Sequence, residues 1–138
     1  MVGTKRFRVE LLTPQWSRSS GECTFAVLPA WDGEIGILAG RAPLVCRLGP
    51  GELVLEVSGR REGYYLDGGF ARMAGNELTV LADRAISSAE VSDEAARSAM
   101  TEARGLKAVG EQGGQARVRQ MARARAQLAI VRRRQSAK

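Results

Sequence analysis

Hydrophobic and polar residues alternate with a period of two through much of the first 87 residues, in short runs separated by turn residues. Leu53, Leu55 and Val57, for example, would face one side of a strand, and the residues between them would face the other. Strands that recur about every 8–12 residues without an intervening helix indicate an all-β sandwich or barrel. The expected strands are Lys5–Leu12, Cys23–Leu28, Glu52–Val57, Glu62–Leu66, Phe70–Ala74 and Glu77–Leu81. The expected turns are Pro50-Gly51, Ser58-Gly59, Asp67-Gly68-Gly69 and Gly75-Asn76.

The pattern becomes helical after Ser88, where alanine replaces the β-branched residues. Ser92 followed by two carboxylates is a good helix start, because the hydroxyl caps the first turn and the acids suit the helix dipole. A second helix is predicted from about Ala116 to Arg133, with an apolar stripe at Met121, Ala124, Leu128 and Val131. Gly105 and the glycines at 110–114 are expected to form a hinge between the two helices.

These elements predict a β-sandwich over residues 1–87 and an antiparallel α-helical hairpin over residues 88–138. The hairpin is expected to be weakly packed, because alanine stripes bury little area and burial is worth roughly 25 cal/mol per Å². Closely spaced arginines on the second helix also repel one another. A closed and an opened hairpin are therefore expected to differ by only about a few kcal/mol.

The positive charge of the chain belongs to its last segment. The whole sequence has 21 basic and 15 acidic residues, a net charge of +6. The segment from Gln115 to the end holds eight basic residues and no acidic one, so the first 114 residues carry 13 basic against 15 acidic, a net of −2. The eight are Arg117, Arg119, Arg123, Arg125, Arg132, Arg133, Arg134 and Lys138. Arginines without acidic neighbours in the sequence favour an acidic partner surface.

The sequence argues against a self-sufficient enzyme. It contains no histidine, which removes the commonest general base and metal ligand. Phosphate-binding loops of the GxxxxGK[ST] type, the GxGxxG fingerprint and HExxH helices are also missing. Cys23 and Cys46 have no CxxC spacing and are expected to be two reduced thiols, with no metal site. No run of about 18 apolar residues occurs, so direct insertion into a membrane is not expected.

Three segments, in this order and spacing, resemble the epsilon subunit of F-type ATP synthases, called delta in mitochondria. They are DGEIGILAGRAPLV at 32–45, YLDGGF at 65–70 and ELTVLADRAI at 77–86. The resemblance implies a sandwich of about ten strands followed by two helices. It also implies a non-catalytic rotor subunit in the central stalk of a proton-translocating synthase. Such a subunit is peripheral, at the cytoplasmic face of the bacterial plasma membrane.

The resemblance implies partners as well. They are the gamma subunit, the membrane rotor ring and the catalytic alpha and beta subunits. The subunit would couple rotation of the ring to ATP synthesis, and its C-terminal helices would restrain ATP hydrolysis. The implied inhibitory residues are Arg117, Arg119, Arg123, Arg125, Arg132, Arg133 and Arg134.

The first of the three segments implies a rotor-ring contact. The residues that fall on it are Asp32, Gly33, Glu34, Arg41, Ala42 and Pro43. Arg41 replaces the usual histidine of the family and Ala39 its usual proline, so details of the contact are expected to differ.

The sequence leaves open whether this chain binds ATP. Many bacterial members carry an I/L-D-x-x-R-A motif at the start of the first helix, and that motif is linked to ATP. This chain has Asp93 and Arg97 four apart instead of three, although both spacings share a helix face. No other cofactor is implied.

A nucleic-acid-binding module with a basic tail is the main alternative. It requires aromatic residues interleaved with basic ones, yet aromatics are 5% of the chain and the tail has none. A membrane-surface helix is a third reading, and the stripe of the second helix lacks the Trp or Phe anchors it needs.

Overall fold

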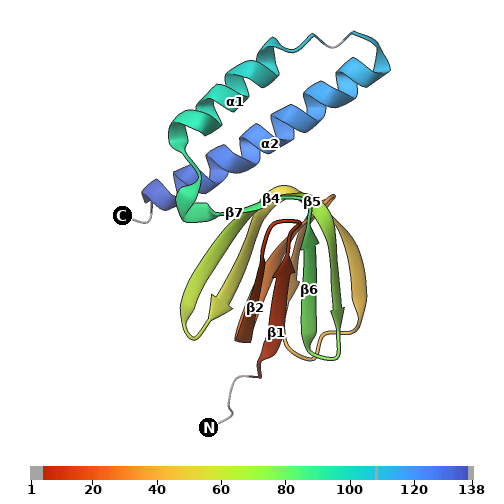
Figure 1. Ribbon diagram of the computed structural model, residues 1–138, viewed down its shortest axis with the longest axis vertical. Coiled ribbons are helices and arrows are strands. Elements are labelled where there is room, and N and C mark those ends of the chain that lie inside the picture. The colour runs from red at the N-terminus through yellow and green to blue at the C-terminus, as the bar shows by residue number, and fades with distance from the viewer. Residues whose placement is uncertain (1–4, 108, 137–138) are drawn as a thin grey trace.

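The computed structural model describes residues 5–107 and 109–136, and these form a closed β structure with a helical hairpin lying across one end (Figure 1). The strands are β1 (Phe7–Leu12), β2 (Ser17–Ala30), β3 (Gly33–Ile37), β4 (Leu44–Val57), β5 (Arg60–Ala74), β6 (Glu77–Ala82) and β7 (Ala85–Ser87). A short 3₁₀ helix, η1 (Ser88–Glu90), leads into α1 (Asp93–Gly105) and α2 (Gly110–Ser136).

The strands form one sheet in the order β1-β6-β5-β4-β2-β3, with β7 added to β5. Strand β1 pairs with both β6, in parallel, and β2, in antiparallel fashion. This double pairing closes the sheet on itself and leaves few exposed edges. The expectation of an all-β module followed by a helical hairpin is confirmed.

The described residues form seven strands, fewer than the ten or so expected, because the longest strands continue through predicted turns. Pro50-Gly51 and Asp67-Gly68-Gly69 lie inside β4 and β5, where Pro50 pairs with Asp67 across the ladder. At Gly69, φ is +127° and a Cβ would overlap the Leu81 carbonyl oxygen, so glycine allows the strand to bend without ending. A bent strand therefore serves both halves of the sandwich.

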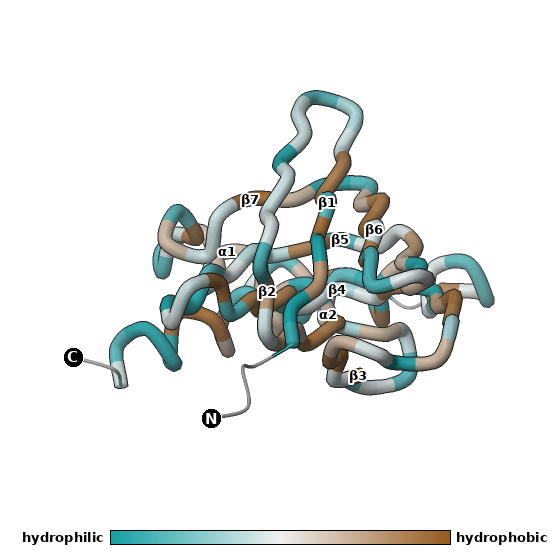
Figure 2. The backbone as a smooth tube through the Cα atoms, turned by 90° about the horizontal axis from the view of Figure 1, so that it is seen from below, coloured by the Kyte–Doolittle hydropathy of each residue, from teal (hydrophilic) through white to brown (hydrophobic). Residues whose placement is uncertain are grey.

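The core of the sandwich comes from the inward positions of all seven strands. Leu53 and Leu55 are buried as the alternation predicts, and Ile37 of β3, a strand the sequence pattern did not reveal, joins them. Hydrophobic stretches run along β1, β6 and β7 in the tube view (Figure 2). One continuous core thus supports the module.

Helix α1 begins as expected, with the Ser92 hydroxyl accepting a hydrogen bond of 3.1 Å from the Ala95 N–H. Helix α2 begins earlier than expected, at Gly110 instead of about Ala116, so Gly113 and Gly114 are helical and do not form a hinge. A glycine disfavours a helix by about 1 kcal/mol relative to alanine. Propagation from the long Ala/Arg segment outweighs that preference here. The connection between the helices is therefore confined to residues 106–109.

Candidate functional site at the junction of helix α2 and the sandwich

A small second core joins the hairpin to the end of the sandwich. Tyr65 of β5 packs with Ile130 and Val131 of α2. Val91 also belongs to this core, and it lies in residues 88–91, the connector between β7 and α1. Burial, reinforced by the negative charge of Asp67, raises the pKa of Tyr65 to about 12. The predicted stripe contributes Val131 to this core and the partly buried Leu128 beside it, whereas Ile130 was not predicted.

Arg123 forms the first polar contact between α2 and the sandwich. Its Nε donates a hydrogen bond of 2.8 Å to Asp67, at the bend of β5. The Asp67 side chain is only 17% exposed, so the pair is shielded from solvent on the carboxylate side.

Arg133 forms the second contact, three turns further along the helix. It lies 2.8 Å from one carboxylate oxygen of Glu52, whose side chain is 12% exposed. The other oxygen accepts a hydrogen bond of 2.6 Å from the Ser88 hydroxyl. Gly63 leaves the space for this network, because a Cβ there would lie 2.5 Å from Glu52 Oε2 and 2.7 Å from Ser88 Oγ.

Arg134 forms the third contact, with the backbone of the connector. Its guanidinium donates to the carbonyl oxygens of Ser88 (2.8 Å), Ala89 (3.2 Å) and Val91 (2.8 Å). A guanidinium presents five donors in a fixed fork, which suits several carbonyls at once. The end of α2 is thereby tied to the segment that leads into α1.

The seven arginines that the sequence singles out are thus divided. Three of them bind groups of the sandwich and the connector, namely Arg123, Arg133 and Arg134. Their acidic or carbonyl partners are far away in the sequence. Arg119, Arg125 and Arg132 are exposed, and within the described residues they form no ion pair. Arg117 is half-buried. Lys138 lies outside the described residues.

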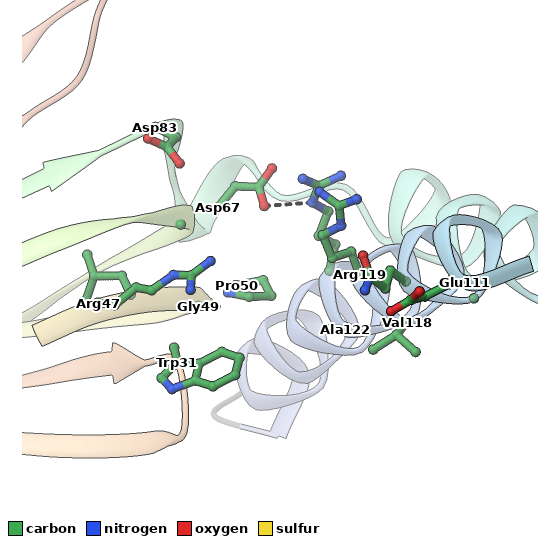
Figure 3. A pocket seen from close by; sticks show the side chains of 15 residues that line it. Trp31, Arg47, Gly49, Pro50, Asp67, Asp83, Glu111, Val118, Arg119 and Ala122 are labelled. Carbon is green, nitrogen blue, oxygen red and sulfur yellow. Dashed lines mark hydrogen bonds and ion pairs between the residues drawn. The ribbon is translucent and has the colours of Figure 1, made fainter.

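The first half of α2 stands away from the sandwich and leaves a cleft of about 1050 Å³ (Figure 3). Trp31 lies on the sandwich side, with the guanidinium of Arg47 5.4 Å from its ring centroid. Three basic side chains line the cleft (Arg47, Arg119 and Arg123), and so do three acidic ones (Asp67, Asp83 and Glu111). These charges balance, so the cleft offers no net attraction for an anion such as ATP.

The six residues of the predicted rotor-ring contact are all exposed, but they lie in two groups. Asp32, Gly33 and Glu34 follow Trp31, at the end of the sandwich that faces α2. Arg41, Ala42 and Pro43 lie beyond the other end of β3, next to the β5–β6 turn. There the Gly40 N–H donates a hydrogen bond of 2.7 Å to the Asn76 side chain. Gly33 and Glu34 are the first two residues of β3, and the five residues of this strand extend over about 17 Å towards the second group.

Asp93 and Arg97 form an ion pair of 2.8 Å on the first turn of α1. The hydrogen bond that Arg97 donates to Asp93, together with the negative charge of Asp93, raises the pKa of Arg97 above its ordinary value. The two side chains share a face, as their spacing predicts, but they satisfy each other. Neither lines the cleft.

An exposed apolar row on the sandwich is a feature that the sequence analysis missed. Val45, Phe70 and Leu81 are 71%, 56% and 52% exposed on the adjacent strands β4, β5 and β6. Phe70 pairs with Leu81 in the ladder. The signal was available in β6, where the neighbours Val80 and Leu81 are both apolar, so that one of them must face outwards.

Among the described residues, no group of three or more His, Cys, Asp or Glu residues is placed to hold a metal ion. None of the helices described is long and apolar enough to cross a membrane.

Comparison with known proteins places residues 6–88 in a described family, the "ATP synthase, Delta/Epsilon chain, beta-sandwich domain". The chain is 35% identical to the ATP synthase epsilon chain of Rhodopirellula baltica, over 88% of this chain and 94% of that one. It is 36% identical to the ATP synthase epsilon chain of Myxococcus xanthus, over 71% and 72% of the two chains.

Solved structures show the same fold. A chain in the cryo-EM structure of the Euglena gracilis mitochondrial ATP synthase (OSCP/F1/c-ring) superposes with a TM-score of 0.82, at 21% identity. That match covers 91% of this chain and 81% of the other. A chain of the central stalk and c-ring structure from Tetrahymena thermophila gives a TM-score of 0.67 at 14% identity, over 91% and 96%.

Proposed function

The chain belongs to the delta/epsilon chain family of ATP synthases, and from this premise we propose that it couples rotation of the rotor ring to ATP synthesis and restrains ATP hydrolysis. It is a central-stalk subunit and not the catalytic one. In this proposal the sandwich, up to residue 87, docks to the stalk. The hairpin, from residue 88, regulates ATP hydrolysis.

The exposed apolar row of Val45, Phe70 and Leu81 carries the docking part of the proposal. Isolated apolar side chains are normal on a surface, but a row across three adjacent strands marks an interaction surface. Arg47 pairs with Phe70 in the ladder, so a basic side chain lies directly beside Phe70, and Val45 lies on the diagonal position. We assign this surface to the gamma subunit, because a stalk subunit needs a permanent apolar contact with the shaft that turns.

The rotor-ring contact is proposed for the acidic turn of Asp32, Gly33 and Glu34. These residues are exposed, and the glycine (φ +148°) shapes a tight turn between β2 and β3. The second group, Arg41, Ala42 and Pro43, would reach the ring only if one contact spanned the length of β3. Separate substitutions at Glu34 and Arg41 distinguish one broad contact from two.

The brake on hydrolysis is proposed for α2, through arginines that face carboxylates of the alpha and beta subunits. An arginine makes two charge-assisted bonds to one carboxylate, which suits recognition of an acidic surface. ATP is not proposed as a ligand, because Asp93 and Arg97 pair with each other and the cleft is neutral. We place the subunit at the cytoplasmic face of the bacterial membrane, peripherally, through its partners. The nucleic-acid alternative is not supported by the family match.

Binding of the full chain to purified gamma subunit tests this proposal. Phe70→Asp is expected to weaken binding at least tenfold, since it removes the aromatic side chain of the row and puts a hydrated carboxylate into an apolar contact. Val109→Asp is the matched control, because Val109 is also exposed but lies in the connection between the helices. Equal affinity of the two variants would contradict the assignment of the surface.

A further inference from the structure

We propose that the arginines of α2 work in two opposed sets. Arg123, Arg133 and Arg134 lock the hairpin onto the sandwich, whereas Arg125 and Arg132 are the ones available to an acidic partner. The inference deepens the proposed brake and rests on it. It predicts that substitutions in the two sets change inhibition in opposite directions.

The helical spacing places Arg123 and Arg134 opposite Arg125 and Arg132, with Arg133 between the two faces. Arg123 and Arg134 are eleven residues apart, close to three turns of 3.6 residues, so they lie on the face that meets the sandwich. Arg125 and Arg132 are seven residues apart, about two turns, and project from roughly the opposite side. One straight helix therefore presents a docking face and a free basic face at the same time.

The lock also holds the connector. Arg134 occupies three carbonyl oxygens of residues 88–91, and Arg133 shares Glu52 with the Ser88 hydroxyl. Residues 88–91 join the sandwich to α1, so the end of α2 fixes the start of α1. Departure of α2 would free the connector, and both helices would be released together.

Gly63 supports this reading independently of the arginines. It lies on β5 beside the side chains of Glu52 and Ser88, and a Cβ there would force both of them to shift. The sandwich thus keeps a space in which a nearly buried carboxylate receives two donors. The ion pair favours the docked hairpin, by a modest amount because the Arg133 side chain is 58% exposed and partly screened.

The lock has two carboxylates on the sandwich side, Glu52 and Asp67, and substitution there leaves every arginine intact. Glu52→Gln and Asp67→Asn keep the shape of each side chain and remove its charge. Glu77→Gln is the matched control, because Glu77 is exposed on β6 and forms no ion pair within the described part of the chain.

Hydrogen exchange on the isolated full chain measures the lock without any other subunit. Amides of the connector and of α2 are expected to exchange about tenfold faster in Glu52→Gln and Asp67→Asn, as expected for the loss of one charge-assisted bond. Exchange in β4 to β6 should stay unchanged, as should all exchange in Glu77→Gln. Arg134→Gln tests the lock from the helix side and is expected to act in the same direction. Exchange equal to that of Glu77→Gln in all three variants would overturn the lock.

The ATPase rate of the assembled soluble head then tests the opposed roles. Glu52→Gln is expected to inhibit more strongly than the natural chain, and the pair Arg125→Ala and Arg132→Ala less strongly. If Glu52→Gln weakened inhibition as the pair does, the two-set proposal would be overturned. If exchange responded as expected but no variant changed the ATPase rate, the lock would stand as a structural contact, and the proposed brake itself would fail.

Discussion

The sandwich and the hairpin differ in how much apolar surface holds each of them. Seventeen buried side chains form the core of the sandwich, whereas five form the core between the hairpin and the sandwich end. Charged contacts at Arg123, Arg133 and Arg134 supplement the smaller core. Apolar burial is non-directional and is not screened by salt, while ion pairs are screened and can exchange partners. The comparison teaches that one region is built to stay folded and the other to be released.

The largest expected effect comes from the core of the sandwich. Leu55→Ala should lower the free energy of unfolding by about 2–5 kcal/mol, because it removes a buried side chain and leaves a cavity. Leu81→Ala, at an exposed position of the same module, should change it by less than about 0.5 kcal/mol. Thermal unfolding measures both. Similar losses in the two variants would mean that the core lies elsewhere.

A smaller and local effect is expected in the hairpin. Ile130→Ala truncates the largest buried side chain of α2 and should weaken its docking by roughly 2–3 kcal/mol. The melting temperature of the sandwich should remain nearly unchanged, because its core does not include Ile130. Hydrogen exchange of α2 against that of β5 separates the two responses. A parallel loss in both regions would contradict their independence.

The alternating positions of β4 made the core of the sandwich predictable, since a period of two needs only local sequence. The docking of α2 was not predictable in the same way. It depends on contacts among residues that are far apart in the chain, such as Glu52, Ser88 and Arg133. The local sequence around each of them does not predict these contacts. The sequence around Gly69 predicts a turn, whereas the structure has a bend inside β5, because glycine is common in both. The exposed row at Phe70 was missed because the outer face of a strand is defined only when its neighbours are known.

Alkaline pH should lower the stability of the sandwich and weaken the docking of the hairpin, each in a different pH range. Burial, with a contribution from the charge of Glu62, raises the pKa of Cys23 to about 11, and burial raises that of Tyr65 to about 12. Each folded form holds its proton more tightly than the unfolded chain does, so stability is complete below the ordinary pKa and falls as pH rises. The sandwich should lose stability above about pH 9 and the hairpin docking above about pH 10. Without histidine, stability should be flat between about pH 6 and 8.

Chemical unfolding followed across this pH range checks the prediction. Cys23→Ala should reduce the fall that begins above about pH 9, to which Cys46 also contributes because burial raises its pKa. Tyr65→Phe should reduce the fall in α2 protection that begins above about pH 10. A stability that rose with pH in these windows would contradict the assigned environments of the two groups.

The smallest expected effect on stability is that of Glu34→Lys, at an exposed turn. Its free energy of unfolding should change by less than about 0.5 kcal/mol. Coupling to the rotor ring should nevertheless weaken, because the change reverses a charge in the proposed contact. Proton pumping by the reconstituted enzyme is the measurement, with Arg41→Glu at the other end of β3 as its counterpart. Normal proton pumping by the Glu34→Lys variant would show that this turn is not part of the rotor-ring contact.

The ATPase rate of the assembled soluble head tests the central claim, that the sandwich docks and the hairpin regulates. The comparison is between the full chain and a chain that ends at Ser88, each first shown to bind the gamma subunit. The full chain should inhibit at low salt and less so as salt rises, because exposed charges are screened over about 8 Å at physiological ionic strength. The shorter chain should bind gamma without inhibiting. Equal ATPase rates with the two chains at every salt concentration would contradict the claim.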